Sequence, residues 1–427
     1  MKLPAFIILL FTFTSDAFAQ LDQNAIQTDF VLYKNRKIFD KYLRDSDINK
    51  VFAQPLDSNT EYDYESACLT ASQFFIQSPQ VKAGFNKLFV QYDSLQYATK
   101  RVFLEALYGI YPGMYENDVR ILLLKETNAK LFAMQALYLF AKDTSQQNRN
   151  TLLPMIESRF TDADSNDILL QLKDYISNHS DYRRQKVPNI DTLFSHQKIL
   201  QQKIIYSFQR WNRDYPGVAI IQNADGSFAK DSAGKLLMFQ QLARAASNLP
   251  YFITDGNTPQ GIFSITGTDV SHNNFLGPTP NIQMVMPFEK DSLYWHTPYD
   301  SSKDALTNYL NLLPAEWQAY QPITEAFYAG KIGRTEIIAH GTTIDPEYFK
   351  GKPFYPLTPT VGCLCAKEEW NTYTGKLLRS DQFNMVNAFV STPGETGYLF
   401  VINLDDQQKA VSREDVEKLV RQYETSQ

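Results

Sequence analysis

The sequence predicts an α+β protein, in which an all-helical N-terminal domain precedes a mostly β domain with a helical insertion and a C-terminal helix. Helical patterns dominate residues 29–179, a polar linker follows near residue 185, and short apolar runs between turn residues fill most of the remainder. The length of 427 residues also exceeds what one ordinary core holds. We therefore expect a helical domain over residues 20–185 and a second domain over residues 186–427.

The first 19 residues have the features of a cleaved signal peptide. They start with Lys2, continue with an apolar run, and end in the small-residue signature Ala17-Phe18-Ala19. The alternative, an N-terminal membrane anchor, would need about 20 apolar residues, roughly twice the length of this run. No later stretch is long and apolar enough to span a bilayer. We expect an exported protein, periplasmic or cell-wall associated, with no membrane span after cleavage.

Composition excludes several functional classes. Apolar residues make up 44% and charged residues 21% of the chain, which is typical of globular proteins and not of disordered ones. The 41 Lys and Arg against 47 Asp and Glu give a net charge of −6, which offers no overall attraction to phosphate backbones. We therefore expect no nucleic-acid partner.

Within the helical domain, apolar residues recur at mixed spacings of three and four, and short polar or Gly/Pro breaks separate the segments. This pattern predicts antiparallel helical pairs, with a solenoid-like array as one arrangement, although no repeat period is clean. Cys68 falls on an apolar helix face, so we expect it to be buried and inert.

The second domain begins with a helix-like segment, Ile199–Asn212, and then changes pattern. Runs of β-branched, aromatic and aliphatic residues predict five strands. These are Gly217–Ile221, Gly261–Ile265, Ile282–Met286, Glu336–Ala339 and Tyr398–Ile402.

Two further helical segments accompany these strands. The stretch from Tyr299 to Gly330 looks helical, and an insertion of this size between strands is often a lid or a binding element. At the C-terminus, a capping-box pattern at Ser412–Asp415 precedes apolar residues at helical spacing, which predicts an amphipathic helix.

Only three cysteines and five histidines are present, so few residues can perform nucleophilic chemistry. His340 ends a predicted strand and Cys363 follows 23 residues later, across a loop that can fold back. A neighbouring imidazole can take the proton of a thiol and so activate it as a nucleophile. The alternative to this catalytic role is a structural one, with a buried histidine and a buried Cys-x-Cys pair. The other four histidines lie in polar stretches typical of surface or loop.

Glycine precedes the thiol at Gly362, where backbone N–H groups can face a developing oxyanion. Three segments in this region occur in a characteristic order. They are Thr258-Pro259-Gln260-Gly261-Ile262-Phe263-Ser264-Ile265, His340-Gly341-Thr342 and Thr360-Val361-Gly362-Cys363. Over residues 215–405 the chain thereby resembles the L,D-transpeptidase (YkuD-like) catalytic domain.

That resemblance implies a mostly β catalytic domain with Cys363 as nucleophile and His340 as base. It further implies oxyanion or substrate-binding roles for Gly362, Gly341 and Thr360, and no metal or organic cofactor. The segment Arg244–Pro250 would lead into the core of the domain.

Two positions depart from the family pattern. Val361 replaces the histidine found two residues before the nucleophile, so any role of that imidazole is missing. Cys365 replaces the Arg or Asn found two residues after it. The Cys-x-Cys spacing leaves two alternatives, a strained disulfide that switches the nucleophile off, or a buried Cys365. Three aromatic residues are expected near the site: Trp317, Tyr320 and Trp370.

The resemblance implies acyl transfer on peptidoglycan stem peptides through a thioester on Cys363. Two alternatives stay open. Water instead of an amine acceptor would make the protein an L,D-carboxypeptidase or hydrolase, whereas a silent site would leave a peptidoglycan-binding or scaffold protein. The helical domain would position the enzyme, bind a protein partner, or only stabilise the fold.

Overall fold

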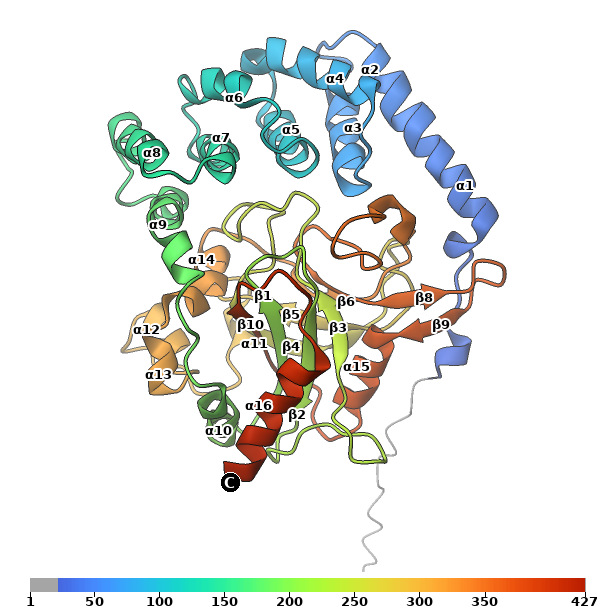
Figure 1. Ribbon diagram of the computed structural model, residues 1–427, viewed down its shortest axis with the longest axis vertical. Helices are drawn as coiled ribbons and strands as arrows, with labels where there is room; N and C mark the ends of the chain where they lie inside the picture. Colours follow the sequence, from blue (N-terminus) through green and yellow to red (C-terminus); the bar gives the residue numbers. More distant parts are fainter. Residues whose placement is uncertain (1–21, 427) are drawn as a thin grey trace, which may run out of the picture.

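A computed structural model describes residues 22–426, and nine α-helices in the first part of it form an arc (Figure 1). The predicted signal peptide lies outside the described residues. These helices are α1 (Tyr33–Tyr42), α2 (Val51–Ala53), α3 (Glu61–Gln73), α4 (Pro79–Val90), α5 (Tyr97–Ile110), α6 (Glu116–Leu123), α7 (Ala129–Lys142), α8 (Gln146–Arg159) and α9 (Asp167–Tyr182). A π-helical stretch, Leu43–Lys50, joins α1 to α2.

Along the arc, α3 packs on α5, α5 on α7, and α7 on α9, while α6 and α8 pack on their neighbours. Polar side chains begin several of these helices by accepting backbone N–H bonds, as Ser78, Asn128, Ser145 and Asn166 do. The N-terminal helical region is thus confirmed, and its pairwise packing agrees with the expected array.

The second part is built on eight strands that close into a barrel in the order β1-β10-β4-β5-β6-β7-β3-β2. Its strands are β1 (Lys203–Arg210), β2 (Gly217–Gln222), β3 (Phe239–Leu242), β4 (Gly261–Asp269), β5 (Asn281–Val285), β6 (Ala339–His340), β7 (Leu364–Ala366) and β10 (Gly397–Asp405). Neighbours pair antiparallel except β1 with β10 and β6 with β7. Strands β8 (Glu368–Trp370) and β9 (Leu377–Ser380) form a separate hairpin.

Helices surround the barrel, so the second part carries more helix and loop than strand, and "mostly β" describes only its centre. The helices are α10 (Ile190–Leu200), α11 (Asp291–Tyr294), α12 (Ala305–Leu310), α13 (Ala315–Gln318), α14 (Glu325–Lys331), α15 (Asp381–Val390) and α16 (Arg413–Ser426). Helices α12 to α14 confirm the helical insertion. In α16, Asp415 and Ser412 exchange the hydrogen bonds of the predicted capping box.

Two predicted elements are wrong. Most of Ile199–Asn212 is the strand β1, whose residues are all buried because both faces pack against other elements, so its apolar run carries no strand alternation. Of Glu336–Ala339 only Ala339 is in a strand, since Glu336 has a left-handed backbone with φ of 60°. The other four predicted strands are confirmed as β2, β4, β5 and β10.

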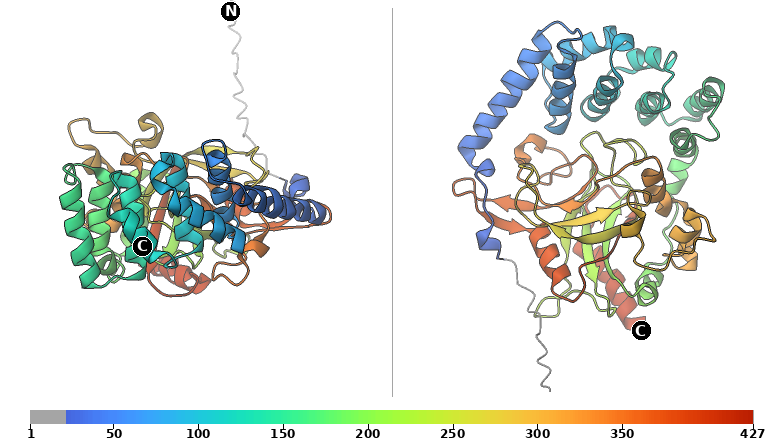
Figure 2. Two further views of the ribbon diagram at one scale, coloured as in Figure 1. Left: turned by 90° about the horizontal axis from the view of Figure 1, so that it is seen from above. Right: turned by 180° about the vertical axis from the view of Figure 1, so that it is seen from behind.

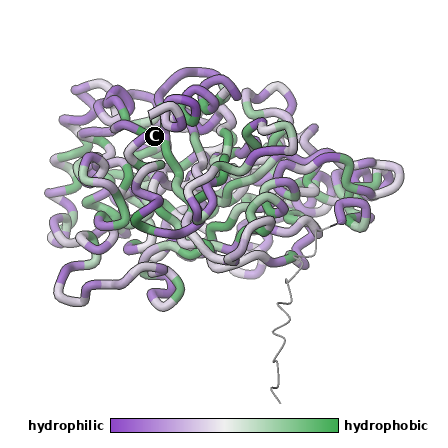
Figure 3. The backbone as a smooth tube through the Cα atoms, turned by 90° about the horizontal axis from the view of Figure 1, so that it is seen from below, coloured by the Kyte–Doolittle hydropathy of each residue, from purple (hydrophilic) through white to green (hydrophobic). Residues whose placement is uncertain are grey.

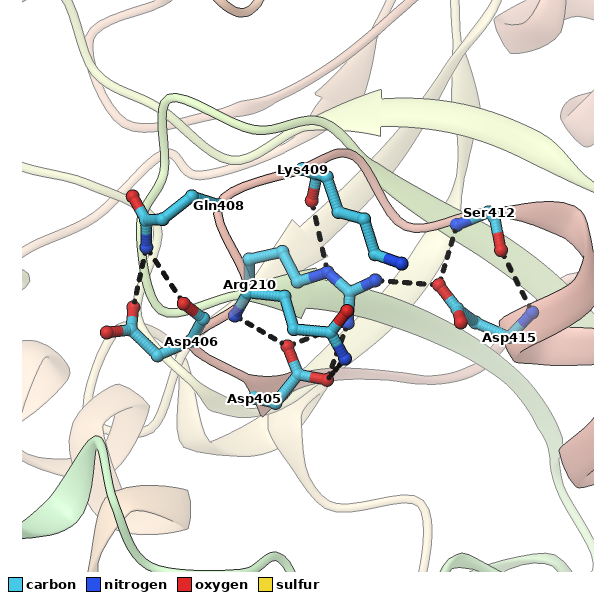
Figure 4. A network of polar contacts seen from close by, with 8 residues as sticks. Arg210, Asp405, Asp406, Gln408, Lys409, Ser412 and Asp415 are labelled. Carbon is cyan, nitrogen blue, oxygen red and sulfur yellow. Dashed lines mark hydrogen bonds and ion pairs between the residues drawn. The ribbon is translucent and has the colours of Figure 1, made fainter.

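Arg210 links the end of β1 to the C-terminal part of the chain by ion pairs (Figure 4). Its guanidinium, 1% exposed, bonds both oxygens of Asp405 at 2.7 and 2.8 Å and reaches Asp415 at 2.6 Å. Because these partners lie in β10 and α16, this one side chain holds the parallel β1-β10 pair and the C-terminal helix together.

The arc and the barrel share a core. One apolar cluster joins the arc helices to Leu249, Phe252, Phe349 and Phe354 of the second part. Seen from behind, the barrel loops lie in the concave side of the arc (Figure 2), and apolar stretches of chain run through the interior of both parts (Figure 3). Among the described residues, no helix is long and apolar enough to cross a membrane.

Candidate functional site

Cys363 lies immediately before β7 and is the one described cysteine that is only partly buried. All three described cysteines are free thiols. Cys68 and Cys365 are fully buried, and burial raises the pKa of both thiols. The prediction that Cys68 is a packing residue is confirmed, and Cys365 takes the buried form of its two alternatives, as a reduced thiol.

The loop before Cys363 is held by two threonine hydroxyls. Thr360 Oγ1 accepts the N–H of Gly362 at 3.0 Å and donates to the carbonyl of Cys363 at 2.8 Å. Thr258 Oγ1 donates to the carbonyl of Gly362 at 2.8 Å. Two of the three motif segments therefore meet at this loop, although 104 residues separate Thr258 from Gly362.

Gly362 cannot be replaced without a clash. Its φ of +124° is rare for residues with a side chain, and an added Cβ would lie 2.4 Å from Arg334 Nη2 and 3.1 Å from the carbonyl of Gly256. The glycine before Cys363 is thus required by the close approach of this guanidinium.

Arg334 lies beneath the loop and was not predicted from the sequence. It is 6% exposed and donates to the carbonyls of Tyr251, Asn257 and Gly256, the last two at 2.9 Å. Burial lowers its pKa to about 10, so it remains a cation at neutral pH. The same side chain therefore braces the loop and places positive charge near Cys363.

The thiol of Cys363 accepts a weak hydrogen bond from the N–H of Ile338 at 3.5 Å. Burial raises its pKa to about 11, against the opposing effects of this bond and of the Arg334 charge. The resting thiol is therefore protonated at neutral pH and needs a base in order to act as a nucleophile.

His340 lies on β6, next to β7 in the barrel, and the parallel register places it beside Cys365. The register partner of Leu364 is Ala339, and the N–H of Leu364 donates to the carbonyl of Ile338 at 3.0 Å. Cys363 is the residue immediately before Leu364, so it precedes the paired part of β7. Among the described contacts, no hydrogen bond joins the His340 ring to Cys363. The pairing of β6 with β7 brings the two predicted residues to neighbouring segments of the barrel.

The ring of His340 is fixed by the carbonyl of Gly341, which bonds Nδ1. Because a carbonyl can only accept, Nδ1 carries the hydrogen, and a neutral ring then has its lone pair on Nε2. Burial lowers the pKa of this histidine, so the ring is neutral at pH 7. Its protonation state suits a general base.

Glu368 supports the turn after His340 and was also missed by the sequence reasoning. Its carboxylate accepts the N–H of Thr342 at 2.8 Å and the hydroxyl of Ser380 at 2.6 Å, and it fills the space beside Gly341, where a Cβ would lie 2.2 Å away. Burial raises its pKa to about 7. No motif marks Glu368, because one of its partners, Thr342, lies in the loop after β6 and the other, Ser380, ends the hairpin strand β9.

Of the three aromatic residues expected near the site, only Trp370 is there. Its indole N–H donates to the carbonyl of Thr342 at 2.8 Å. Trp317 and Tyr320 are buried in the core around α10, where Trp317 bonds the carbonyl of Asn189. Val361 is 54% exposed, so the position that holds histidine in the resembled family faces solvent.

The segment Arg244–Pro250 is hydrogen-bonded to the loop that precedes Cys363. The carbonyl of Arg244 accepts the N–H of Thr360 at 3.2 Å, and the N–H of Ala246 donates to the carbonyl of Thr360 at 2.7 Å. Helix α5 presses on this segment through Gly109, whose added Cβ would lie 2.7 Å from the carbonyl of Ala246.

Two cations of the arc also reach the neighbouring loop. Arg101 pairs with Asp255 at 3.0 Å, and Lys130 donates to Thr254 Oγ1 at 2.7 Å. These contacts stand next to Gly256 and Thr258, so the arc braces the loop that contacts Gly362.

The described residues contain no group of three or more His, Cys, Asp or Glu side chains placed to hold a metal ion. Comparison of the chain with protein-family models, with curated proteins and with solved structures finds no match.

Proposed function

We propose that the protein is an exported, cysteine-dependent acyltransferase of the L,D-transpeptidase type that acts on peptidoglycan stem peptides. The observation that carries this proposal is the accessible Cys363 immediately before β7, beside the strand that bears His340, with the Thr258 and Thr360 segments bonded to its loop. The barrel is the catalytic domain in this proposal.

In the first half-reaction, Cys363 Sγ attacks the carbonyl that joins an L-centre to the terminal D-amino acid, while its proton passes to Nε2 of His340. The N–H of Gly362 is already bonded within the loop, whereas that of Cys363 has no partner among the described residues. The oxyanion role therefore falls to the Cys363 N–H. The intermediate collapses, the C–N bond breaks, and the proton on His340 leaves with the D-amino acid.

In the second half-reaction, an amine of a neighbouring stem attacks the thioester. The new amide is the cross-link, and the proton released by the amine returns to the thiolate. Arg334 favours the thiolate during both steps because its charge lies near the sulfur.

The test replaces Cys363 with alanine and follows release of the terminal D-amino acid from a tetrapeptide stem. We expect a loss of at least about a thousandfold, because nucleophile and base act as one unit. Cys68→Ala is the matched control, since it removes a buried thiol of the arc, and it should retain activity. Undiminished release by Cys363→Ala would refute the proposal.

A silent binding protein is the specific rival, because the His340 ring bonds Gly341 and the pKa of Cys363 is raised. Alkylation at neutral pH, measured with and without a stem peptide, separates the two. In an active enzyme the peptide converts the Cys363 thiol to a thioester and so slows its alkylation. The same alkylation rate with and without the peptide, together with no D-amino acid release, would favour the rival.

A further inference from the structure

A polar cavity of about 350 Å³ lies between the arc and the barrel. Helices α7 and α9 line one side, and the chain after β1 together with the 248–258 loop lines the other. A second cavity of about 150 Å³ shares Tyr175, His179, Tyr251 and Glu325 with it, so the two chambers adjoin. Neither Cys363 nor His340 lines either chamber, and the mechanism above does not use this space.

The smaller chamber combines aromatic rings with carboxylates. Tyrosines 175, 182, 251 and 328 line it together with Asp174 and Glu325, and no Lys or Arg does. Asp174 Oδ1 accepts from Asn178 and Tyr182, and Glu325 Oε2 accepts from the N–H of Gln260, and no further hydrogen bond to either carboxyl is found among the described contacts. Burial raises the pKa of Glu325 to about 7, so its carboxyl is partly ionised at neutral pH. Aromatic faces and carboxylates together attract an ammonium group.

The larger chamber adds hydrogen-bond donors. Two carboxyls also line it, those of Asp214, which pairs with Arg244, and of Glu325, which is shared with the smaller chamber. Trp211 is 9% exposed and lines the chamber, and its indole N–H has no partner within the described chain. Arg213, 6% exposed, is held by the carbonyls of Arg210 and Thr258 at 2.9 and 3.0 Å. It stays charged, because burial lowers its pKa only to about 10. An indole N–H and a guanidinium in a shared wall favour an anionic group.

His179 lines both chambers. The sequence suggested a surface position, but its ring stacks on Tyr175 with centroids 4.2 Å apart and meets the edge of Trp211 at 5.7 Å. Burial lowers its pKa to about 3, so the ring is neutral and adds no charge to either chamber.

From this arrangement we propose that the two chambers bind a small zwitterion with separated charges, such as a short peptide with free termini. The ammonium lies in the tyrosine-lined chamber against Asp174 and Glu325, and the carboxylate lies toward Trp211 and Arg213. A plain anion would meet the carboxylates of the smaller chamber, and a plain cation would leave the Trp211 N–H unpaired. This site is independent of the Cys363 chemistry.

Calorimetric titration of the full chain tests the pairing of charges. The probe is 6-aminohexanoate, and its two halves are hexylamine and hexanoate. We expect 6-aminohexanoate to bind at least about tenfold more tightly than either half. Equal affinity for hexylamine, or no binding of 6-aminohexanoate at about 10 mM, overturns the proposal.

Variants then place the ligand in the chambers. Asp174→Asn and Glu325→Gln keep the shape and should each weaken 6-aminohexanoate binding about tenfold, whereas Trp211→Phe should weaken it about threefold. Asp181→Asn is the matched control, because Asp181 lies on the same helix α9 but pairs with Arg184 at the surface. Unchanged affinity in correctly folded Asp174→Asn and Glu325→Gln, checked by circular dichroism, overturns the assignment.

Discussion

The arc and the barrel are stabilised in different ways. Side chains of the barrel strands belong to two apolar clusters that are separate from that of the arc. Two successive residues of β1, Ile204 and Ile205, belong to different clusters, one on each face of the strand. The arc has one cluster, and this cluster includes side chains from the barrel half, Phe252 and Phe354 among them. The barrel therefore carries its own core, whereas the core of the arc is completed only by the loops it covers.

The site depends on both parts to different degrees. The barrel supplies Cys363, His340 and their closest supports, Arg334 and Glu368. The arc contributes none of these residues, but it contacts the 244–258 segment through Gly109, Arg101 and Lys130. The residues of the proposed chemistry therefore all belong to the barrel, while the arc contacts the loop that supports them.

The largest effect is expected from Phe252→Ala, which opens a cavity in the shared core. Phe252 is fully buried and lies 5.9 Å from the Tyr175 ring of α9. We expect a loss of about 3–5 kcal/mol in the free energy of unfolding. All four tryptophans lie after residue 210, so their fluorescence reports the barrel half, whereas far-ultraviolet circular dichroism reports mainly helix.

In Phe252→Ala, the circular dichroism transition should precede the fluorescence transition in denaturant, because the arc loses its contact with the barrel. Phe263→Ala, in a barrel cluster, is the control with the same change of volume. Phe263→Ala should lose a similar free energy of unfolding, and its circular dichroism and fluorescence transitions should coincide. Coincident transitions in both variants would show that arc and barrel unfold as one unit.

A smaller effect is expected from Arg101→Ala. This change removes the cation that joins Glu105 of α5 to Asp255 and leaves the nearly buried Glu105 carboxyl without it. We expect a loss of about 2 kcal/mol in stability. The matched change Arg44→Ala removes an exposed pair with Asp40 and should cost less than about 0.5 kcal/mol. Equal losses in the two variants would contradict a bracing role for Arg101.

The smallest effect concerns pH and the barrel alone. The pKa of Glu368 is raised from 4.5 to about 7, so between these values the folded protein holds a proton that the unfolded chain has lost. Stability from this group therefore falls as pH rises through that window. Urea denaturation between pH 6 and 8 should show Glu368→Gln losing about 1–2 kcal/mol less than the parent protein over that range. A parallel decline of the free energy of unfolding in both proteins would contradict this role of Glu368.

Much of the fold and of the site could be predicted from sequence, wherever the signal is local. The helical spacing of the N-terminal half, the Ser412–Asp415 capping box and four β-branched runs all gave correct elements. The motif segments identified Thr258, Thr360 and Gly362, and the structure joins these by hydrogen bonds. Arg334 and Glu368 could not be found in this way, because their roles come from contacts with residues far away in the sequence.

The sequence by itself determined the helical and mixed regions, the buried Cys68, and a small set of residues able to perform thiol chemistry. Those features follow from periodicity, capping and residue type, which act over a few neighbouring residues. Only the tertiary structure decided that Lys203–Arg210 is a strand, that the two-residue β6 sets His340 beside the segment that begins at Cys363, and that a polar cavity lies between the arc and the barrel. Each of these depends on which distant segments pack together, because strand pairing, burial and enclosed space exist only after the chain has folded.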